Sequence, residues 1–166
     1  MSARKVLVVE DEEAIRVLIE RFLVSGGYSV VSTGDSTQAL ELARQVQPDL
    51  VLCDIAMPGM DGYSVLKALQ SDPVTARLPV VFLTAQREFT ERVRAFRFGV
   101  VDYMTKPFTR DLLVKKVERV LLSLADRPGV RQDGTVESLL KDVQREARSG
   151  VLTVTGEGAA GRAVIE

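Results

Sequence analysis

The chain has 166 residues, of which 46% are hydrophobic, so it can bury a full core in one domain with an appendage. Its formal net charge of −1 gives no reason to expect a nucleic-acid or membrane-surface partner. The absence of histidine and the single cysteine, Cys53, exclude Ser-His-Asp and Cys-His catalysis, histidine-ligated zinc or iron, and an internal disulfide. Any chemistry must therefore use carboxylates, hydroxyls, lysine or arginine.

The apolar segments of the chain are short. None approaches the roughly 18 residues that a membrane-spanning helix needs. The N-terminal residues lead directly into a strand-like run and lack the apolar core and cleavage site of a signal peptide. We therefore expect a cytoplasmic protein without a membrane partner.

The first 125 residues alternate short, β-branched apolar runs with segments whose apolar residues recur at helical spacing. The predicted strands cover, in chain order, residues 5–9, 28–32, 50–53, 79–83 and 100–104. The helices predicted after them lie within residues 15–23, 39–46, 65–69, 89–96 and 113–124. This βα repeat predicts a parallel sheet that is covered by helices on both faces.

The remaining residues break this pattern. A linker is followed by an amphipathic helix over residues 136–147 and by two strands, at residues 151–155 and 162–166. A Gly-rich turn at residues 156–161 joins these strands. One helix and one hairpin are too small to fold alone, so this segment is expected to be the start of a second, truncated α/β domain, or else to pack on the first domain. The predicted first domain, linker and second domain are residues 1–125, 126–134 and 135–166.

Polar residues follow the predicted strands at the edge where an open α/β sheet binds its ligands. They are Glu10 and Asp11 after the first strand, Asp54 after the third, Thr84 after the fourth and Lys106 after the fifth. Because the carboxyl ends of parallel strands meet at one edge, we expect these side chains to share one crevice.

The acids among them suit a hard cation. Carboxylates at close range raise each other's pKa unless a cation intervenes, and Mg²⁺ prefers oxygen ligands with room for water. Acids at strand-to-helix junctions are also commonly solvated or cap helices. That alternative is favoured for Glu12 and Glu13, which fall in a first helical turn. It is disfavoured for Asp11 and Asp54, because both follow apolar strands.

Lys106 and Thr84 add the groups that bind a phosphoryl oxygen. A strand-end lysine can neutralise a phosphoryl group as a point charge, and Pro107 can form a cis bond that aims it into the crevice. In isolation, Lys-Pro would usually be an exposed turn and Thr84 a helix cap. Together with the acids they predict phosphoryl transfer onto a carboxylate. Since the sequence has no histidine, a phosphohistidine donor must be another protein.

Several short motifs occur in unbroken order over residues 4–125. They are Val8-Val-Glu-Asp-Glu12, Asp54 with Met57-Pro-Gly-Met-Asp-Gly62, Thr84-Ala85, Asp102-Tyr103 and Lys106-Pro107-Phe108. As an ordered set, they resemble the receiver domain of a two-component response regulator. The resemblance implies a flavodoxin-like, doubly wound sheet in strand order 2-1-3-4-5, to which the C-terminal helix and β-hairpin would be appended. It also implies that the protein is not an enzyme beyond its own autophosphorylation and autodephosphorylation.

The resemblance further implies a metal site and a phosphorylation site. Asp54 would accept a phosphoryl group from a histidine kinase or histidine phosphotransfer protein. Asp11, Asp54 and the backbone carbonyl of Ala56 would ligate Mg²⁺, for which Mn²⁺ can substitute, and Glu10 would contribute through water. Glu10 stands where many receivers have Asp, and this difference would shift the metal geometry slightly.

The same resemblance implies how phosphorylation is sensed. Lys106 would pair with the phosphoryl group, Thr84 would move toward it, and Tyr103 would turn inward behind Thr84. A half-buried strand aromatic is the alternative for Tyr103. Ala85 leaves the space beside Thr84 open. Cys53 is expected to be a small buried hydrophobic residue.

In this family, partners distinguish the phosphorylated from the unphosphorylated state at the surface formed by helix four, strand five and helix five. The corresponding charged residues here are Arg92, Arg94, Arg97, Asp102, Lys115 and Lys116. This face would form a homodimer, or is simply solvated. Residues 135–166 show no basic recognition helix and resemble, over one helix and one strand, the opening of a PATAN-like domain, so no direct nucleic-acid binding is expected.

Three other classes fit less well. A haloacid-dehalogenase-type phosphatase needs a second aspartate two residues after its nucleophile, where this chain has Ala56. A P-loop protein needs a Gly-Lys-Ser/Thr loop after the first strand, where this chain has acids. A degenerate receiver that only binds partners usually lacks an acid or the lysine, and both are present here. Phospho-acceptor signalling is therefore the favoured function.

Overall fold

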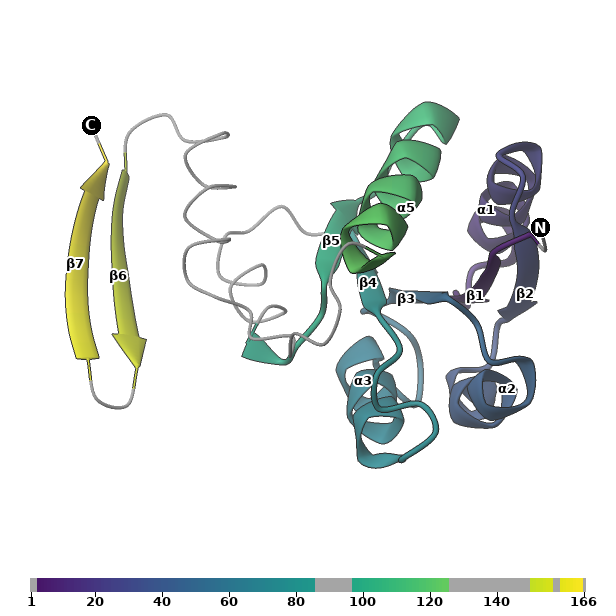
Figure 1. The fold of residues 1–166 in the computed structure, drawn as a ribbon, viewed down its shortest axis with the longest axis horizontal. Helices are drawn as coiled ribbons and strands as arrows, with labels where there is room; N and C mark the ends of the chain where they lie inside the picture. The colour runs from purple at the N-terminus through teal and green to yellow at the C-terminus, as the bar shows by residue number, and fades with distance from the viewer. Residues whose placement is uncertain (1–2, 86–96, 126–149, 157–158, 166) are drawn as a thin grey trace. The chain divides into compact units, whose positions relative to one another are not determined.

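The computed structural model describes residues 3–85, 97–125, 150–156 and 159–165 (Figure 1). The chain divides into two compact units, Met1–Gln132 and Asp133–Glu166, and each is described by itself. None of the helices in the described part of the chain is long and apolar enough to span a membrane.

The first unit alternates strands and helices as predicted. Its described strands are β1 (Lys5–Val9), β2 (Ser29–Thr33), β3 (Leu50–Asp54), β4 (Val80–Thr84) and β5 (Asp102–Thr105). Its described helices are α1 (Glu13–Ser25), the 3₁₀ helix η1 (Ser36–Gln38), α2 (Ala39–Val46), α3 (Gly62–Ser71) and α5 (Arg110–Ala125). The helix predicted within residues 89–96 lies outside the described residues.

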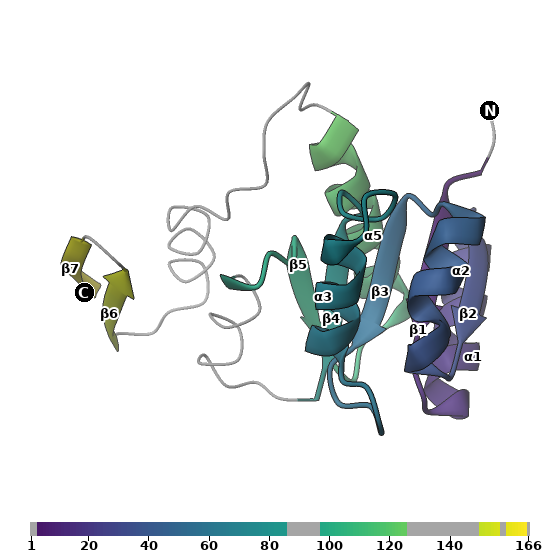
Figure 2. The same cartoon turned by 90° about the horizontal axis from the view of Figure 1, so that it is seen from below.

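The five strands form one parallel sheet in the order β2-β1-β3-β4-β5. This arrangement confirms the predicted flavodoxin-like fold. Figure 1 shows α1 and α5 on one face of the sheet and α2 and α3 on the other, and Figure 2 shows the same layers from below. The carboxyl ends of β1, β3 and β4 lie side by side, because Val9 pairs with Cys53 and Asp54 pairs with Leu83.

The core lies on both faces of this sheet because successive strand residues point to opposite sides. In β1, Val6 and Val8 pack into the core under α1 and α5, whereas Leu7 and Val9 pack into the core under α2 and α3. All four are fully buried, which explains why the strand is a continuous apolar run. Cys53 is also fully buried, as predicted.

The bounds of four strands differ from the prediction by one or two residues at one or both ends, and β3 extends to Asp54. The structure begins β2 at Ser29 and β4 at Val80, and it begins β5 at Asp102. The bounds follow from pairing with the neighbouring strand, which apolar patterning alone does not specify. Thr84 is consequently the last residue of β4, paired with Thr105, rather than the first residue after the strand.

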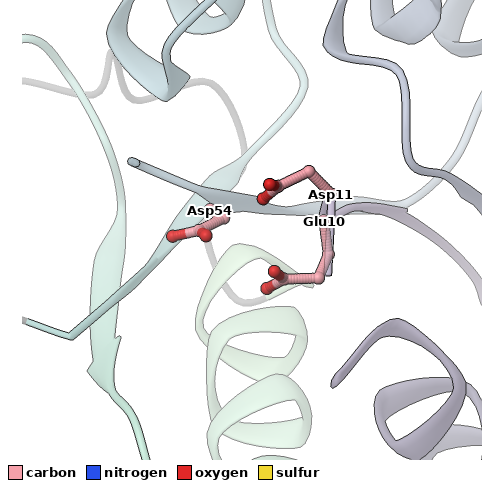
Figure 3. A group of neighbouring side chains, drawn as sticks. All are labelled: Glu10, Asp11 and Asp54. Atoms are coloured by element: carbon pink, nitrogen blue, oxygen red, sulfur yellow. The ribbon is translucent and has the colours of Figure 1, made fainter. Parts of the chain in front are cut away.

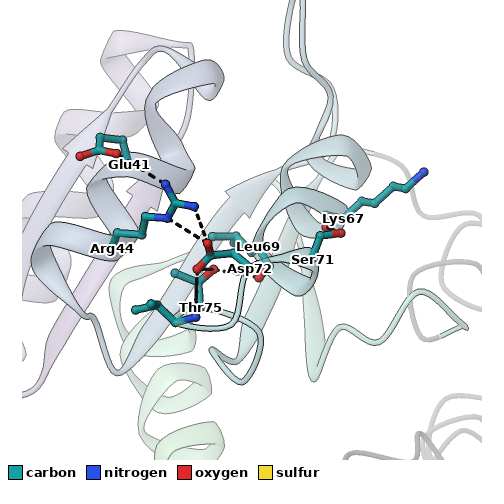
Figure 4. Close-up of polar contacts among 8 residues, drawn as sticks. Glu41, Arg44, Lys67, Leu69, Ser71, Asp72 and Thr75 are labelled. Carbon is teal, nitrogen blue, oxygen red and sulfur yellow. Dashed lines mark hydrogen bonds and ion pairs between the residues drawn. The ribbon is translucent and has the colours of Figure 1, made fainter.

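A network of polar side chains lies at the edge of the sheet opposite the carboxyl ends of the strands (Figure 4). Arg44 of α2 donates through Nε, at 3.0 Å, and through Nη2 to the carboxylate of Asp72, which follows α3. The other Asp72 oxygen accepts from the amides of Val74, at 3.0 Å, and Thr75, at 3.2 Å. The Thr75 hydroxyl donates to the Leu69 carbonyl at 2.8 Å. This network links α2 to the loop that leads from α3 into β4.

The second unit contains a hairpin. Strands β6 (Gly150–Gly156) and β7 (Ala159–Ile165) pair antiparallel, with Gly150 opposite Ile165 and Gly156 opposite Ala159. Two strands therefore occur where the sequence predicts them, but β6 is one residue longer at each end and β7 begins three residues earlier. The turn is consequently shorter than residues 156–161, because pairing continues to Gly156 and Ala159. The predicted linker and the helix at residues 136–147 lie outside the described residues, and the predicted domain bounds stay a prediction.

Candidate functional site

Three carboxylates meet at the carboxyl edge of the sheet. Glu10 and Asp11 follow β1, and Asp54 ends the adjacent strand β3. One oxygen from each lies within 4.8 Å of the others, and Figure 3 shows the three side chains grouped around one point. Glu10 is fully buried and Asp54 is 5% exposed, whereas Asp11 is exposed. The sheet thus brings together the three acids that the sequence predicts.

The ammonium group of Lys106 lies among these carboxylates. Its Nζ is 2.9 Å from Asp54 Oδ2 and 2.6 Å from Glu10 Oε2. The loop after β5 carries Lys106 across the sheet edge, where its amide donates to the Thr84 carbonyl at 2.7 Å. The Lys106–Pro107 peptide bond is cis. Lys106 therefore faces the carboxylates of two other strands rather than an open turn.

The protonation of this cluster follows from burial and charge. Burial raises the pKa of Glu10 above its usual value and outweighs the hydrogen bond from Lys106, which lowers it. Burial alone would lower the pKa of Lys106, but its hydrogen bonds to Glu10 and Asp54 outweigh burial and raise it. Lys106 is therefore a stable cation beside two buried carboxylates.

The acid cluster fits a hard divalent cation. Glu10 is fully buried, and its Oε2 is paired with the Lys106 ammonium at 2.6 Å. The exposed Asp11 carboxylate supplies a further oxygen on the solvent side. Oxygen donors with open access to water are the ligand set that Mg²⁺ prefers. The residues present thus fit the predicted metal.

The loop after β3 is shaped by one close backbone approach. A Cβ at Gly62 would lie 2.4 Å from the Asp54 carbonyl oxygen, so only glycine fits there. The Gly62 amide donates to the Ile55 carbonyl at 2.9 Å, which folds the loop back on itself. Ala56 is exposed, and its amide donates to Asp54 Oδ1 at 3.3 Å. The loop thereby orients the Asp54 carboxylate.

Thr84 lies on β4, which pairs with the strand of Asp54, and Tyr103 lies on β5, which pairs with β4 on its other side. Thr84 is 6% exposed at the end of β4, at the same sheet edge as Asp54. Tyr103 is half-buried on β5, opposite Phe82, and packs against the core under α2 and α3. Lys116 Nζ lies 5.9 Å from the centre of the Tyr103 ring. Their proposed role as a switch pair stays a prediction.

The structure describes part of the charged face that was predicted on helix four, β5 and α5. Asp102 is 7% exposed and accepts from Lys116 Nζ at 2.9 Å and from Arg119 Nη2 at 2.6 Å. Its own strand neighbour Tyr103 donates an amide to the other oxygen at 2.8 Å. Lys115 and Arg97 are exposed, and Arg92 and Arg94 lie outside the described residues. Sequence reasoning missed Arg119, although its spacing of three residues from Lys116 places both on one side of α5.

A doubly wound parallel sheet with a lysine and three carboxylates at its carboxyl edge defines a class of signalling domains, and comparison with known proteins agrees. Residues 6–118 match the response regulator receiver domain model, and the chain belongs to this family. This finding confirms the resemblance for the first unit. The match does not reach residues 135–166, so their likeness to a PATAN-like domain stays a prediction.

Two of the curated relatives are named as transcriptional regulators. The chain is 37% identical to the DNA-binding dual master transcriptional regulator RpaA of Synechocystis, over 74% of this chain and 51% of that protein. It is 39% identical to the phosphate regulon regulatory protein PhoB of Escherichia coli, over 72% of this chain and 52% of that protein. The chain thus spans about half the length of the curated relatives it matches.

Solved structures show the same fold. A response regulator from Chloroflexus aurantiacus superposes with a TM-score of 0.69 and 32% identity, covering 73% of this chain and 99% of that one. The receiver domain of the sensor histidine kinase PA1611 from Pseudomonas aeruginosa has a TM-score of 0.66 and 32% identity, covering 72% and 98%. That structure is described as having a magnesium ion coordinated in its active-site cleft.

Proposed function

We propose that Asp54 accepts a phosphoryl group from the phosphohistidine of a histidine kinase or histidine phosphotransfer protein. The observation that carries this proposal is the position of the Asp54 carboxylate. It is 5% exposed, its Oδ2 lies 2.9 Å from the Lys106 ammonium, and one of its oxygens lies within 4.8 Å of carboxylate oxygens of Glu10 and Asp11. Because the printed sequence contains no histidine, the donor imidazole comes from outside it.

In the reaction, an Asp54 carboxylate oxygen attacks phosphorus, and the P–N bond to the donor imidazole breaks. The electron pair stays on the imidazole nitrogen, which takes up a proton. Attack by water on the resulting acyl phosphate returns the carboxylate and inorganic phosphate, so the chain is a phospho-accepting signalling protein rather than an enzyme acting on other substrates. Lys106 neutralises one phosphoryl oxygen, and Thr84 donates its hydroxyl to another.

Asp11, Asp54 and the Ala56 carbonyl would hold Mg²⁺ or Mn²⁺, with Glu10 contributing through water. The bound cation would shield the negative charge of the phosphoryl oxygens. The magnesium ion in the active-site cleft of the PA1611 receiver domain supports a magnesium site in this chain as well. The three carboxylates support it from the chain itself, since one oxygen each of Glu10, Asp11 and Asp54 lies within 4.8 Å of the others.

Phosphorylation would be read through the face formed by β5 and α5. Thr84 and Tyr103 are the proposed switch pair, and Asp102 with Lys116 and Arg119 forms the charged part of a homodimer surface. A two-fold contact through charged side chains is self-complementary when both signs are present on one face. The expected setting is the cytoplasm, without a membrane partner and without direct nucleic-acid contact by this chain.

The test is phosphorylation by acetyl phosphate with Mg²⁺, followed by intact-protein mass spectrometry. The wild-type chain should gain one phosphoryl group, and Asp54→Ala should gain none. Asp111→Ala, which removes an exposed carboxylate of α5, serves as the matched control and should label like the wild type. Labelling of Asp54→Ala, or labelling of the wild type that a chelator does not reduce, would overturn the proposal.

A further inference from the structure

The Asp11 carboxylate is oriented by its backbone. In the described part of the chain, no hydrogen bond or ion pair holds its carboxylate oxygens, and the residue is exposed. Its direction toward Asp54 in Figure 3 therefore depends on the conformation of residues 10–12. Any group that fixes this turn also fixes where the Asp11 oxygens lie.

Arg16, one turn into α1, is such a group. Its Nη1 donates to the Glu10 carbonyl at 2.9 Å and lies 3.4 Å from the Asp11 carbonyl as a second acceptor. Its own amide donates to the Glu12 carbonyl at 2.9 Å. One side chain thus contacts the backbone of both acids without contacting their carboxylates.

Gly34 makes room for this guanidinium. A Cβ at Gly34 would lie 2.5 Å from Arg16 Nη1 and 3.2 Å from Arg16 Cζ, and the three atoms nearest to it all belong to Arg16. The residue before it, Thr33, accepts the Glu10 amide at 3.1 Å, so the loop after β2 runs directly beside the acid turn. The Arg16 guanidinium therefore packs between the turn after β1 and the loop after β2, in space that a side chain at Gly34 would fill.

We propose that Arg16 is a positioning residue for the divalent cation: it holds the carbonyls of Glu10 and Asp11 so that the Asp11 carboxylate points toward Asp54. This inference rests on the proposed metal site and adds a residue to it. It predicts a change in cation affinity opposite to the change that simple electrostatics predicts. Removing a positive charge near a cation site should strengthen cation binding, whereas loss of a positioning residue should weaken it.

The test is Mg²⁺ titration of the full chain by isothermal calorimetry. Arg16→Ala should raise the Kd for Mg²⁺ by about 10-fold, the lower end for loss of a group that orients a metal ligand. Arg21→Ala, an exposed arginine of the same helix, is the matched charge control and should leave the Kd close to that of the wild type. Arg16→Lys keeps the charge and one donor and should recover part of the affinity. An unchanged or lower Kd in Arg16→Ala would overturn the inference.

Gly34→Ala provides the second arm, because it displaces the guanidinium without removing its charge. It should weaken Mg²⁺ binding in the wild-type background and have no further effect in the Arg16→Ala background, since both changes act through one contact. Equal effects in both backgrounds would show that Gly34→Ala acts independently of Arg16 and would contradict the inference. A wild-type chain that does not bind Mg²⁺ would instead refute the proposed metal site.

Discussion

Lys106 Nζ lies 2.9 Å from Asp54 Oδ2, although the two residues are 52 positions apart in the sequence. The contact is made by neighbouring strand ends: β3 delivers Asp54, and the loop after β5 crosses the end of β4 to deliver Lys106. The same ammonium contacts Glu10 from β1. A phosphoryl group on Asp54 would compete for this cation, so Lys106 is well placed to report phosphorylation.

Replacement of Lys106 should therefore allow phosphorylation of Asp54 but prevent the change in oligomeric state that follows it. We expect Lys106→Ala to accept a phosphoryl group from acetyl phosphate about 10²-fold more slowly, as when one charged donor at a reacting oxygen is lost. The phosphorylated variant should fail to change its oligomeric state, measured by sedimentation velocity. Lys67→Ala, which removes an exposed lysine of α3, is the control. A wild-type shift in the oligomeric state of Lys106→Ala would argue against Lys106 as the link.

Asp102 is expected to stabilise the β5–α5 face and the dimer. Asp102→Asn removes the negative charge that both Lys116 and Arg119 contact. The free energy of unfolding should fall by only about 1 kcal/mol, because the Arg119 side chain is half exposed and water screens its contact with Asp102. Urea denaturation measures this change. Dimerisation after phosphorylation should weaken as well, whereas Lys115→Ala, an exposed neighbour on α5, should leave stability unchanged. An Asp102→Asn chain with wild-type stability and dimerisation would contradict this role.

The contact between Arg44 and Asp72 predicts a pH dependence of stability. The hydrogen bond from Arg44 holds the pKa of Asp72 below its usual value, with help from the amides of Val74 and Thr75. A carboxylate whose pKa is lower in the folded state stabilises the fold above its unfolded pKa of about 3.9. That stabilisation is lost as the pH falls through the folded pKa.

Asp72→Asn should therefore lower the thermal unfolding midpoint at pH 7 and flatten its decline between about pH 5 and pH 2. Differential scanning calorimetry over this range gives the comparison. Asp111→Asn, at an exposed carboxylate, controls for the change in net charge. A decline in Asp72→Asn as steep as in the wild type would show that other groups carry the acid sensitivity.

The sequence predicts that the strand-end acids, Thr84 and Lys106 lie together, because the carboxyl ends of parallel strands lie at one edge of the sheet. It does not predict contacts that depend on side-chain reach across loops. The apolar residues of α1 predict the helix but not the role of Arg16. The hydrogen bonds of Arg16 go to backbone carbonyls, and no pattern of residue types predicts such bonds. Gly62 ends one of the motifs that the sequence shows, but the reason for a glycine is visible only in the structure, where a Cβ would lie 2.4 Å from the Asp54 carbonyl oxygen. The extension of β4 to Thr84 likewise depends on pairing with β5.

The most direct test of the account is the identity of the phosphorylated residue. Borohydride reduces an aspartyl phosphate to homoserine, so treatment of the phosphorylated chain followed by peptide mass spectrometry reports the acceptor position. The account predicts homoserine at position 54, formed only when Mg²⁺ and a phosphodonor are both supplied. Homoserine at position 11 or at another aspartate, with position 54 unmodified, would contradict it.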